Sequence, residues 1–208
     1  MFQHMERTKG NMKTQKQVIL ITGTPGVGKT SVARLLVSRI NALYINLTKL
    51  AVKENLITEF DKERGSYIVN EAKVRKKVAN MIKTADKPII IDGHYAVFVA
   101  PKELVTHVFV LRRDPVELKA LLEQRGFSGQ KLWENLAAEI LDTCLMDALN
   151  IMAESAKICE INICGKNVSK VVDEILAILK GEKKCSFGIV DWLGKLEQEG
   201  VLEDYLKI

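Results

Sequence analysis

The sequence predicts an α/β fold in which a five-stranded parallel sheet is covered by helices on both faces. Short apolar runs alternate with segments of helical periodicity along most of the 208 residues. The apolar runs are nearly continuous, which is typical of strands that are buried on both faces. The first run leads directly into a glycine-rich loop and then a helical pattern, as in doubly wound sheets.

The expected strands are short and often β-branched, and they follow one another at spacings that leave room for crossover helices. They lie at residues 18–21, 43–47, 88–91, 107–111 and 158–164. Helical patterns are expected at residues 29–40, 48–56, 70–84, 115–125, 130–155 and 168–180. The pattern at 130–155 is the longest, and it is predicted as a single helix.

Length and composition indicate one globular domain with a small insertion. Hydrophobic residues make up 47% and charged residues 27% of the chain, and no apolar run is long enough to span a bilayer. The polar, Lys-rich residues 1–16 have no apolar core of the kind that a secretory signal needs, so they are interpreted as a disordered tail or a remnant of cloning. We expect a cytoplasmic protein with no membrane partner. The net charge of +5 is compatible with RNA or with a site for polyanionic nucleotides.

The four cysteines give no sign of a zinc site. Cys144, Cys159, Cys164 and Cys185 lack CxxC spacing, and the three histidines do not flank them at the intervals of zinc ligands. We expect the cysteines to be reduced and structural.

Residues 23–30 read GTPGVGKT, a full match to the phosphate-binding pattern GxxxxGK[ST]. Glycines let the backbone turn its N–H groups toward phosphate oxygens, and the following helix directs its positive end at the same anion. Lys29 is predicted to reach the β- and γ-phosphates of ATP, and the Thr30 hydroxyl to hold Mg²⁺. The predicted nucleotide-binding residues of this loop are Gly23, Gly26, Val27, Gly28, Lys29, Thr30 and Ser31.

The motif alone admits GTPases, motor or helicase ATPases and small-molecule kinases. The chain has no NKxD element for guanine, and it is short for a helicase or motor core. Asp92 ends the apolar strand 88–91, where a carboxylate would hold Mg²⁺ through water. His94, two residues on, is a candidate to orient a water or the acceptor, with a structural role as the alternative.

Three arginines are predicted near the transferring phosphoryl group. Arg112 and Arg113 follow the strand 107–111, and Arg125 precedes Gly126 in a turn between two helices, a sensible place for a lid. Cations delivered there would stabilise the charge that develops on the phosphoryl oxygens. The alternative is that they are solvated arginines on helix surfaces.

With these residues the sequence resembles the adenylate kinase isoenzyme six family, also described as coilin-interacting nuclear ATPase proteins, which has archaeal members. The resemblance spans about residues 18–180. It rests on residues 22–30 and 44–46, Asp92-x-His94, Val110-Leu111-Arg112, Arg125-Gly126-Phe127, Lys131-Leu132, Glu134-Asn135 and Glu139-Ile140.

The resemblance implies a P-loop NTPase fold and the transfer of the γ-phosphoryl group of ATP to AMP, giving two ADP, with an additional ATPase activity. It implies catalytic roles for Lys29, Asp92, His94 and Arg125, with Arg125 also contacting ATP. Residues 46–68 would be the monophosphate-binding segment and 124–134 the lid of a kinase domain at 17–180. It also implies two partners, a small-subunit platform ribosomal protein and pre-ribosomal RNA.

The chain departs from the family in two places. Asn46-Leu47-Thr48-Lys49 stands where the family has a Gly-Asp pair, and Tyr95-Ala96-Val97-Phe98 replaces a more polar run. Residues 181–208 lie outside the resemblance. Their amphipathic pattern predicts a helical extension that packs on the protein's own surface or meets a partner.

Three functions stay open from the sequence. One is an adenylate kinase with ATPase activity and a role in maturation of the small ribosomal subunit. Another is a ribosome-assembly ATPase switch whose kinase activity is incidental. The third is a P-loop kinase for a small metabolite.

Overall fold

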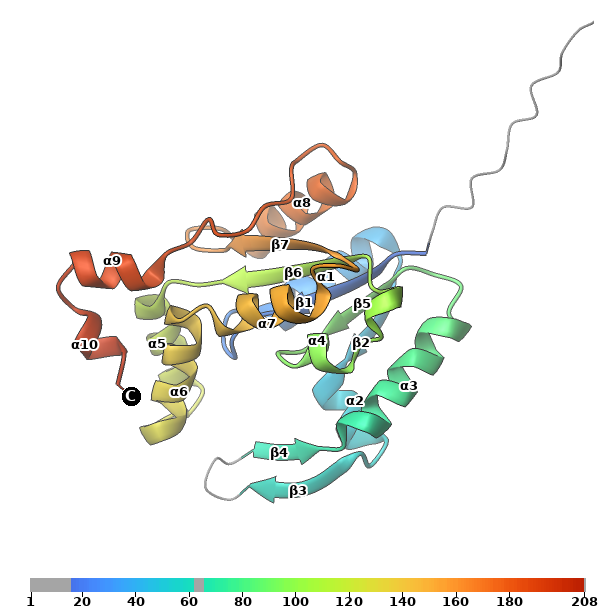
Figure 1. Ribbon diagram of the computed structural model, residues 1–208, viewed down its shortest axis with the longest axis horizontal. Coiled ribbons are helices and arrows are strands. Elements are labelled where there is room, and N and C mark those ends of the chain that lie inside the picture. The colour runs from blue at the N-terminus through green and yellow to red at the C-terminus, as the bar shows by residue number, and fades with distance from the viewer. Residues whose placement is uncertain (1–15, 62–65, 208) are drawn as a thin grey trace, which may run out of the picture.

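The computed structural model describes residues 16–61 and 66–207, and a parallel sheet lies at its centre (Figure 1). The strand order is β2-β5-β1-β6-β7, and each neighbouring pair is parallel. The strands are β1 Val18–Thr22, β2 Leu43–Asn46, β5 Ile89–Asp92, β6 His107–Arg112 and β7 Lys157–Asn162. All five predicted strands are present, so the predicted fold class is confirmed. Because β1 is central, the glycine-rich loop that follows it lies at the carboxyl ends of its neighbours β5 and β6.

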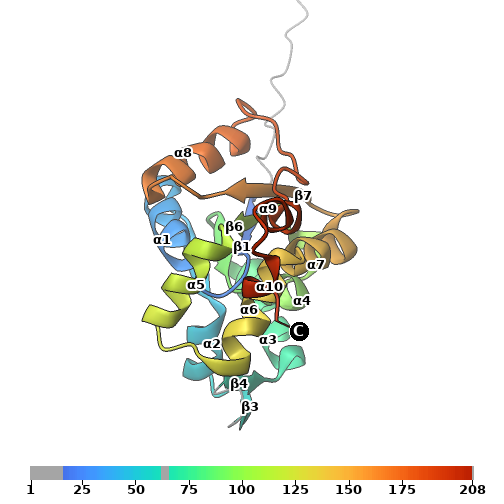
Figure 2. The same ribbon diagram turned by 90° about the vertical axis from the view of Figure 1, so that its left-hand side faces the viewer.

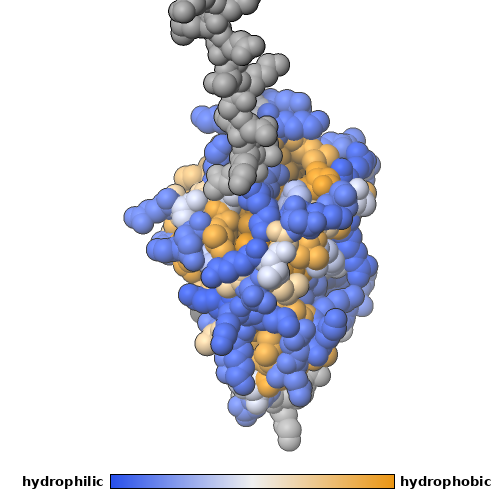
Figure 3. Space-filling model, turned by 90° about the vertical axis from the view of Figure 1, so that its right-hand side faces the viewer, coloured by the Kyte–Doolittle hydropathy of each residue, from blue (hydrophilic) through white to orange (hydrophobic). Residues whose placement is uncertain are grey.

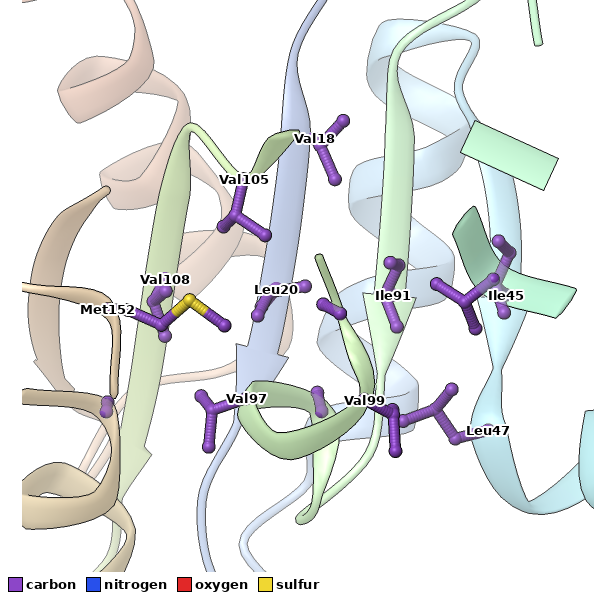
Figure 4. Close-up of a cluster of buried hydrophobic side chains, with 14 of the residues drawn as sticks. Val18, Leu20, Ile45, Leu47, Ile91, Val97, Val99, Val105, Val108 and Met152 are labelled. Carbon is purple, nitrogen blue, oxygen red and sulfur yellow. The ribbon is translucent and has the colours of Figure 1, made fainter. Parts of the chain in front are cut away.

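Helices cover both faces of the sheet, as Figure 2 shows in a view along the layers. Alternate residues of a strand point to opposite faces, so Val18 and Leu20 of β1 enter one hydrophobic cluster, and Ile19 and Ile21 enter the other. The first cluster, part of which is drawn in Figure 4, is completed by α2 Leu47–Lys53, α3 Glu71–Thr84, α4 Ala96–Val99 and α7 Thr143–Met152. The second is completed by α1 Lys29–Ile40, α5 Pro115–Gln124, α6 Gly129–Ile140 and α8 Val168–Leu179.

The prediction of one helix at residues 130–155 is wrong, because α6 and α7 are separated there. Asp142 has a positive φ of 58° and stands as the N-cap of α7. Aspartate tolerates this left-handed conformation better than most residues. Its carboxylate also accepts a hydrogen bond from the buried Arg112 side chain, which holds the corner against the sheet.

The segment between α2 and α3 contains an antiparallel hairpin that the sequence analysis missed. It consists of β3 Ile57–Asp61 and β4 Ser66–Val69, and it lies apart from the main sheet (Figure 1). Its residues alternate poorly in hydropathy, which hides a strand signal. The short helix α4 and the 3-10 turn Lys102–Leu104 were also not predicted.

The C-terminal extension folds back on the protein. It contains α9 Trp192–Gln198 and α10 Leu202–Tyr205, with Trp192 and Leu196 buried. This packing on the protein's own surface is one of the two predicted outcomes. The predicted tail at residues 1–16 lies outside the described residues, except for Lys16.

The prediction that all four cysteines are reduced is wrong for one pair. Cys159 of β7 and Cys185 form a disulfide, whereas Cys144 and Cys164 are free. The backbone N–H of Glu160 donates to the carbonyl of Ser186 at 2.8 Å, so the chain after α8 returns along β7 and brings the two cysteines together. A separation of 26 residues along the chain gives no local motif that would reveal the pair.

No helix in the described part of the chain combines the length and the apolar composition that crossing a bilayer requires. The face in Figure 3 is largely hydrophilic, with apolar side chains scattered between the polar ones.

Candidate active site

The glycine-rich loop connects β1 to α1, and its conformation requires glycine at some positions. Gly23 has a φ of 132°, and a Cβ there would lie 2.5 Å from the carbonyl oxygen of Leu111. Gly28 occupies the N-cap position of α1 with a φ of 102°, and it has no side chain that could accept a hydrogen bond from the first turn. No acidic residue occupies the first turn of α1, so no carboxylate there competes with a bound anion for the positive end of the helix.

The predicted loop residues differ in exposure. Val27 is buried, and Gly26 is in the left-handed region, with Leu118 and Leu122 of α5 close to its Cα. Ser31 is exposed on the first turn of α1, and its N–H donates to the carbonyl of Gly28 at 3.1 Å. The loop is thus fixed by packing on one side and open on the other.

Lys29 opens α1 and folds back over the loop. Its ammonium group donates hydrogen bonds to the carbonyl oxygens of Gly23 at 2.7 Å and Thr24 at 2.9 Å. Burial lowers the pKa of Lys29, while the negative charge of Asp92 acts in the opposite direction. The amine is therefore held at the inner rim of the loop.

Asp92 lies at the carboxyl end of β5, between β1 and β2, and only 1% of it is exposed. Its Oδ2 accepts hydrogen bonds from Thr30 Oγ1 at 2.8 Å, Tyr44 Oη at 2.9 Å and Asn46 Nδ2 at 2.8 Å. The structure thus brings the two predicted magnesium ligands, Thr30 and Asp92, into direct contact.

The sequence did not reveal that Tyr44 and Asn46 are hydrogen-bond partners of Asp92. Burial, followed by the hydrogen bond to Asp92, raises the pKa of Tyr44, so the phenol keeps its proton as a donor. Asn46 Oδ1 accepts from the N–H of Lys49 and so caps α2. The signal was the polar end of strand 43–47, which is the neighbour of β5 in the sheet.

His94 lies two residues beyond Asp92 and lines a pocket. The residue is largely exposed, yet desolvation of the ring, followed by the charge of Lys29, lowers the pKa of His94 to about 4. Its imidazole is therefore neutral at pH 7. The carbonyl of His94 accepts a hydrogen bond from Thr22 Oγ1 at 3.2 Å.

Arg125 is exposed at the C-cap of α5, directly before Gly126 and the start of α6. After burial, its positive charge is a smaller cause of the lowered pKa of Lys29. The predicted lid, residues 124–134, comprises the end of α5, the turn that follows it and the first half of α6.

The prediction that Arg112 and Arg113 contact the transferring group is wrong. Arg112 is 1% exposed and donates to Glu139 at 2.9 Å and to Glu160 at 2.6 Å. Both carboxylates are also buried. Burial by itself lowers the pKa of Arg112, but the charges and hydrogen bonds of Glu139 and Asp142 outweigh it and raise that pKa. Arg113 pairs with Glu117 at 2.7 Å. The sequence placed a cation at a strand end but gave no sign of the distant carboxylates that neutralise it.

A pocket of about 600 Å³ adjoins the glycine-rich loop. One wall comes from α2 and the hairpin, another from the β5–α4 connection, and a third from α6 and the start of α7. The lining residues are Thr24, Pro25, Thr48, Ala51, Val52, Ile57, Val69, His94, Tyr95, Phe98, Phe127, Lys131, Glu134, Asn135, Ala138, Thr143, Cys144 and Asp147. This mainly apolar pocket is large enough for a nucleotide-sized ligand.

The oxygen atoms of Thr30 and Asp92 fit a magnesium ion that is held mainly by substrate and water. Magnesium prefers oxygen ligands and commonly takes only one or two from the protein. The hydrogen bonds from Thr30, Tyr44 and Asn46 to the Asp92 carboxylate all use Oδ2, so Oδ1 could accept from a metal-bound water. The described residues contain no cluster of three or more acidic, histidine or cysteine side chains that would form a separate metal cage.

Two solved structures, each of a protein described as a kinase, have a similar fold. A shikimate kinase from Bacteroides thetaiotaomicron has a TM-score of 0.50 and 16% sequence identity, and the match covers 79% of this chain and 98% of that chain. A sugar kinase from Janibacter sp. has a TM-score of 0.53 and 16% sequence identity, and the match covers 79% of this chain and 95% of that chain. These likenesses establish the fold.

The sequence comparisons identify the family. A family model described as "AAA domain" matches residues 19–142. The "Putative adenylate kinase" of Methanocaldococcus jannaschii is 37% identical over 177 residues, covering 85% of this chain and 93% of the relative. The protein of the same name from Methanococcus maripaludis is 38% identical over 181 residues, with 85% and 95% covered, and that from Saccharolobus solfataricus is 32% identical over 191 residues, with 92% and 95% covered. The predicted family is confirmed: the chain belongs to the archaeal family of these adenylate kinases, and so to a family of nucleoside monophosphate kinases.

Proposed function

We propose that the protein transfers the γ-phosphoryl group of ATP to AMP, giving two ADP. The observation that carries the proposal is the contact of Thr30 with Asp92 at the end of the glycine-rich loop, whose residues Thr24 and Pro25 line the pocket. ATP would bind the loop through Gly23, Gly26, Val27, Gly28, Lys29, Thr30 and Ser31. AMP would occupy the pocket between the segment 46–68 and the lid 124–134, within a kinase domain at 17–180.

The residues of this chain mainly position the two substrates and stabilise charge. Lys29 would donate to the β- and γ-phosphates once it leaves the carbonyls of Gly23 and Thr24. Arg125 would approach the same group from the lid, and the lid wall of the pocket would exclude water. Neutral His94 would orient the attacking phosphate or, in ATP hydrolysis, a water.

Magnesium would be held by Thr30 and, through water, by Asp92. When bound, it neutralises phosphate charge and so favours attack on the γ-phosphorus.

The test is a panel of acceptors. The protein is incubated with ATP, Mg²⁺ and each of AMP, GMP, CMP and UMP, and formation of both diphosphates is measured. Rapid ADP formation with AMP, and much slower product with the others, supports the proposal. Hydrolysis of ATP at one rate, whichever monophosphate is added, would overturn it.

A ribosome-assembly ATPase is the second candidate. The observation that favours it is a set of exposed cations on α3, which could contact RNA phosphates: Lys73, Arg75, Lys76 and Lys83. The partners proposed from the family resemblance are a small-subunit platform ribosomal protein and pre-ribosomal RNA. Affinity purification in ATP and in ADP tests it, because a switch would retain a ribosomal partner in only one nucleotide state.

A kinase for a small metabolite is the third candidate. Its supporting observation is the largely apolar pocket, in which Lys131 and His94 are the basic side chains among the described lining residues. If the protein binds ATP tightly but phosphorylates none of the four monophosphates, this candidate is favoured.

A further inference from the structure

The C-terminal segment, residues 185–207 and called the strap below, lies beside the two helices that form the lid. Figures 1 and 2 both place α9 and α10 next to α5 and α6, and α9 and α10 each contact α6. The proposed kinase mechanism assigns the strap no role.

The strap is anchored to the edge of the sheet. Cys185 is joined to Cys159 of β7 by the disulfide, and the carbonyl of Ser186 accepts from the N–H of Glu160 at 2.8 Å. Further on, the N–H of Ile189 donates to Glu160 Oε2 at 2.7 Å. The root of the strap is therefore fixed to the rigid part of the fold.

From this root the strap reaches the last turn of α6 through Trp192. The indole is 7% exposed, and its Nε1–H donates to Glu139 Oε1 at 3.2 Å. Glu139 is 1% exposed and also accepts from Arg112 Nε of β6. One buried carboxylate thus joins the strap, the lid helix and the sheet.

The strap also contacts α5 and the outer side of α6. Lys195 forms an ion pair with Asp114, whose carboxylate accepts from the N–H of Val116 and caps α5. Near the C-terminus, the ammonium of Lys207 lies 4.3 Å from the ring centre of Trp133 on α6. These contacts lie on both sides of the corner that carries Arg125.

The same helix α6 lines the pocket on another face, through Lys131, Glu134 and Ala138. A helix moves nearly as a rigid element, so a contact at Glu139 fixes the pocket wall from the adjacent Ala138 to Lys131, about two turns away. We propose that the strap holds α6 in the orientation that binds the acceptor, and that Trp192 is a positioning residue acting through Glu139. The acceptor part of this inference rests on the proposed function.

The experiment combines steady-state kinetics with hydrogen exchange on the full-length protein. Trp192→Phe removes the N–H donor and keeps an aromatic ring. Lys195→Met breaks the second contact and serves where Trp192→Phe folds poorly. Phe187→Leu is the matched control, because Phe187 belongs to the strap but is 54% exposed.

We expect Trp192→Phe and Lys195→Met to raise KM for AMP by about 3- to 10-fold while kcat changes by less than about twofold, since a smaller fraction of the molecules would be ready to bind. Amides of α6 should exchange several-fold faster in both variants. KM for ATP and exchange in the β-sheet should match the wild type, as should all values for Phe187→Leu.

Unchanged exchange in α6, or unchanged KM for AMP in a protein that phosphorylates AMP, overturns the positioning role. Faster exchange throughout the sheet, with kcat and both KM values altered, also overturns it, because Trp192 would then only stabilise the fold. If wild-type protein phosphorylates no monophosphate while α6 alone exchanges faster in the variants, the proposed function fails but the hold of the strap on α6 is supported.

Discussion

Thr30 Oγ1 donates a 2.8 Å hydrogen bond to Asp92 Oδ2, joining the first turn of α1 to the carboxyl end of β5. The two residues are 62 positions apart, and the parallel pairing of β1 with β5 brings them together. Asn46 on β2 and Tyr44 complete the donors around the same oxygen. The sheet thus presents one oriented carboxylate beside the glycine-rich loop.

Replacing Asp92 by Asn should remove the charge with little change in shape. We expect the kinase rate to fall on the order of 100-fold and the Mg²⁺ concentration for half-maximal rate to rise, because a neutral amide attracts a metal-bound water weakly. Magnesium titrations of the rate measure both effects. Asp86→Asn, at an exposed position, is the control, and equal magnesium curves for the two variants would exclude the assigned role of Asp92.

Lys29→Met should abolish most turnover and leave the fold intact. The ammonium donates hydrogen bonds to two loop carbonyls and is desolvated, so its removal costs the protein little stability. We expect kcat/KM to fall by at least about 100-fold because a cation is lost from the transferring group. A thermal melt verifies folding. A near-normal rate in a folded variant would refute the site.

The lowered pKa of His94 predicts a specific pH dependence of stability. The folded state favours the neutral ring: the pKa of His94 is about 4 there, against 6.5 for an ordinary histidine. As the pH falls, His94 is therefore protonated in the unfolded chain before it is protonated in the folded protein. The stability that the neutral ring contributes is fully present above pH 6.5, and it is lost as the pH falls toward 4. His94→Gln should lose less stability than the wild type over this window in denaturant titrations. Parallel losses in the two proteins would show that the ring titrates normally.

The same neutral ring predicts no inflection from His94 in the kinase rate near pH 6.5. His94→Gln should lower the rate, yet any inflection of the wild-type profile between pH 6 and 7 should persist in the variant. An inflection that disappears with His94 would place its pKa in that range.

The sequence predicted the parts of the fold and site that depend on local patterns. Continuous apolar runs identified the strands, and the spacing from Gly23 to Thr30 identified the loop, because the chemistry of phosphate binding requires those residues in that order. Asp92 was found because it ends a buried strand. Each of these signals lies within a few residues along the chain.

The parts that were missed depend on contacts between distant segments. Arg112 looks like a catalytic cation in sequence, but Glu139 on α6 and Glu160 on β7 neutralise it. The break at Asp142 and the disulfide of Cys159 with Cys185 likewise need a partner that only the folded chain supplies. Tertiary pairing here outweighs the local pattern.

Arg112→Leu should destabilise the protein far more than Arg113→Leu. Without Arg112, Glu139 and Glu160 would be buried charges lacking their counterion, which costs about 3–5 kcal/mol. Arg113 pairs with Glu117 at a partly exposed site, where such an ion pair contributes about 0–1 kcal/mol. Urea denaturation of both variants gives the comparison. Similar free energies of unfolding would indicate that the carboxylates find other donors.

The disulfide should contribute measurably to stability, because it closes a loop between β7 and the root of the strap. For a separation of 26 residues, loss of the cross-link should lower the free energy of unfolding by about 2–4 kcal/mol. Cys185→Ser and the wild type treated with a dithiol reductant should show the same loss in denaturant titrations, and the reductant should leave Cys185→Ser unchanged. A reductant effect that persists in the variant would have to arise elsewhere than at this bond, since Cys144 and Cys164 are already free.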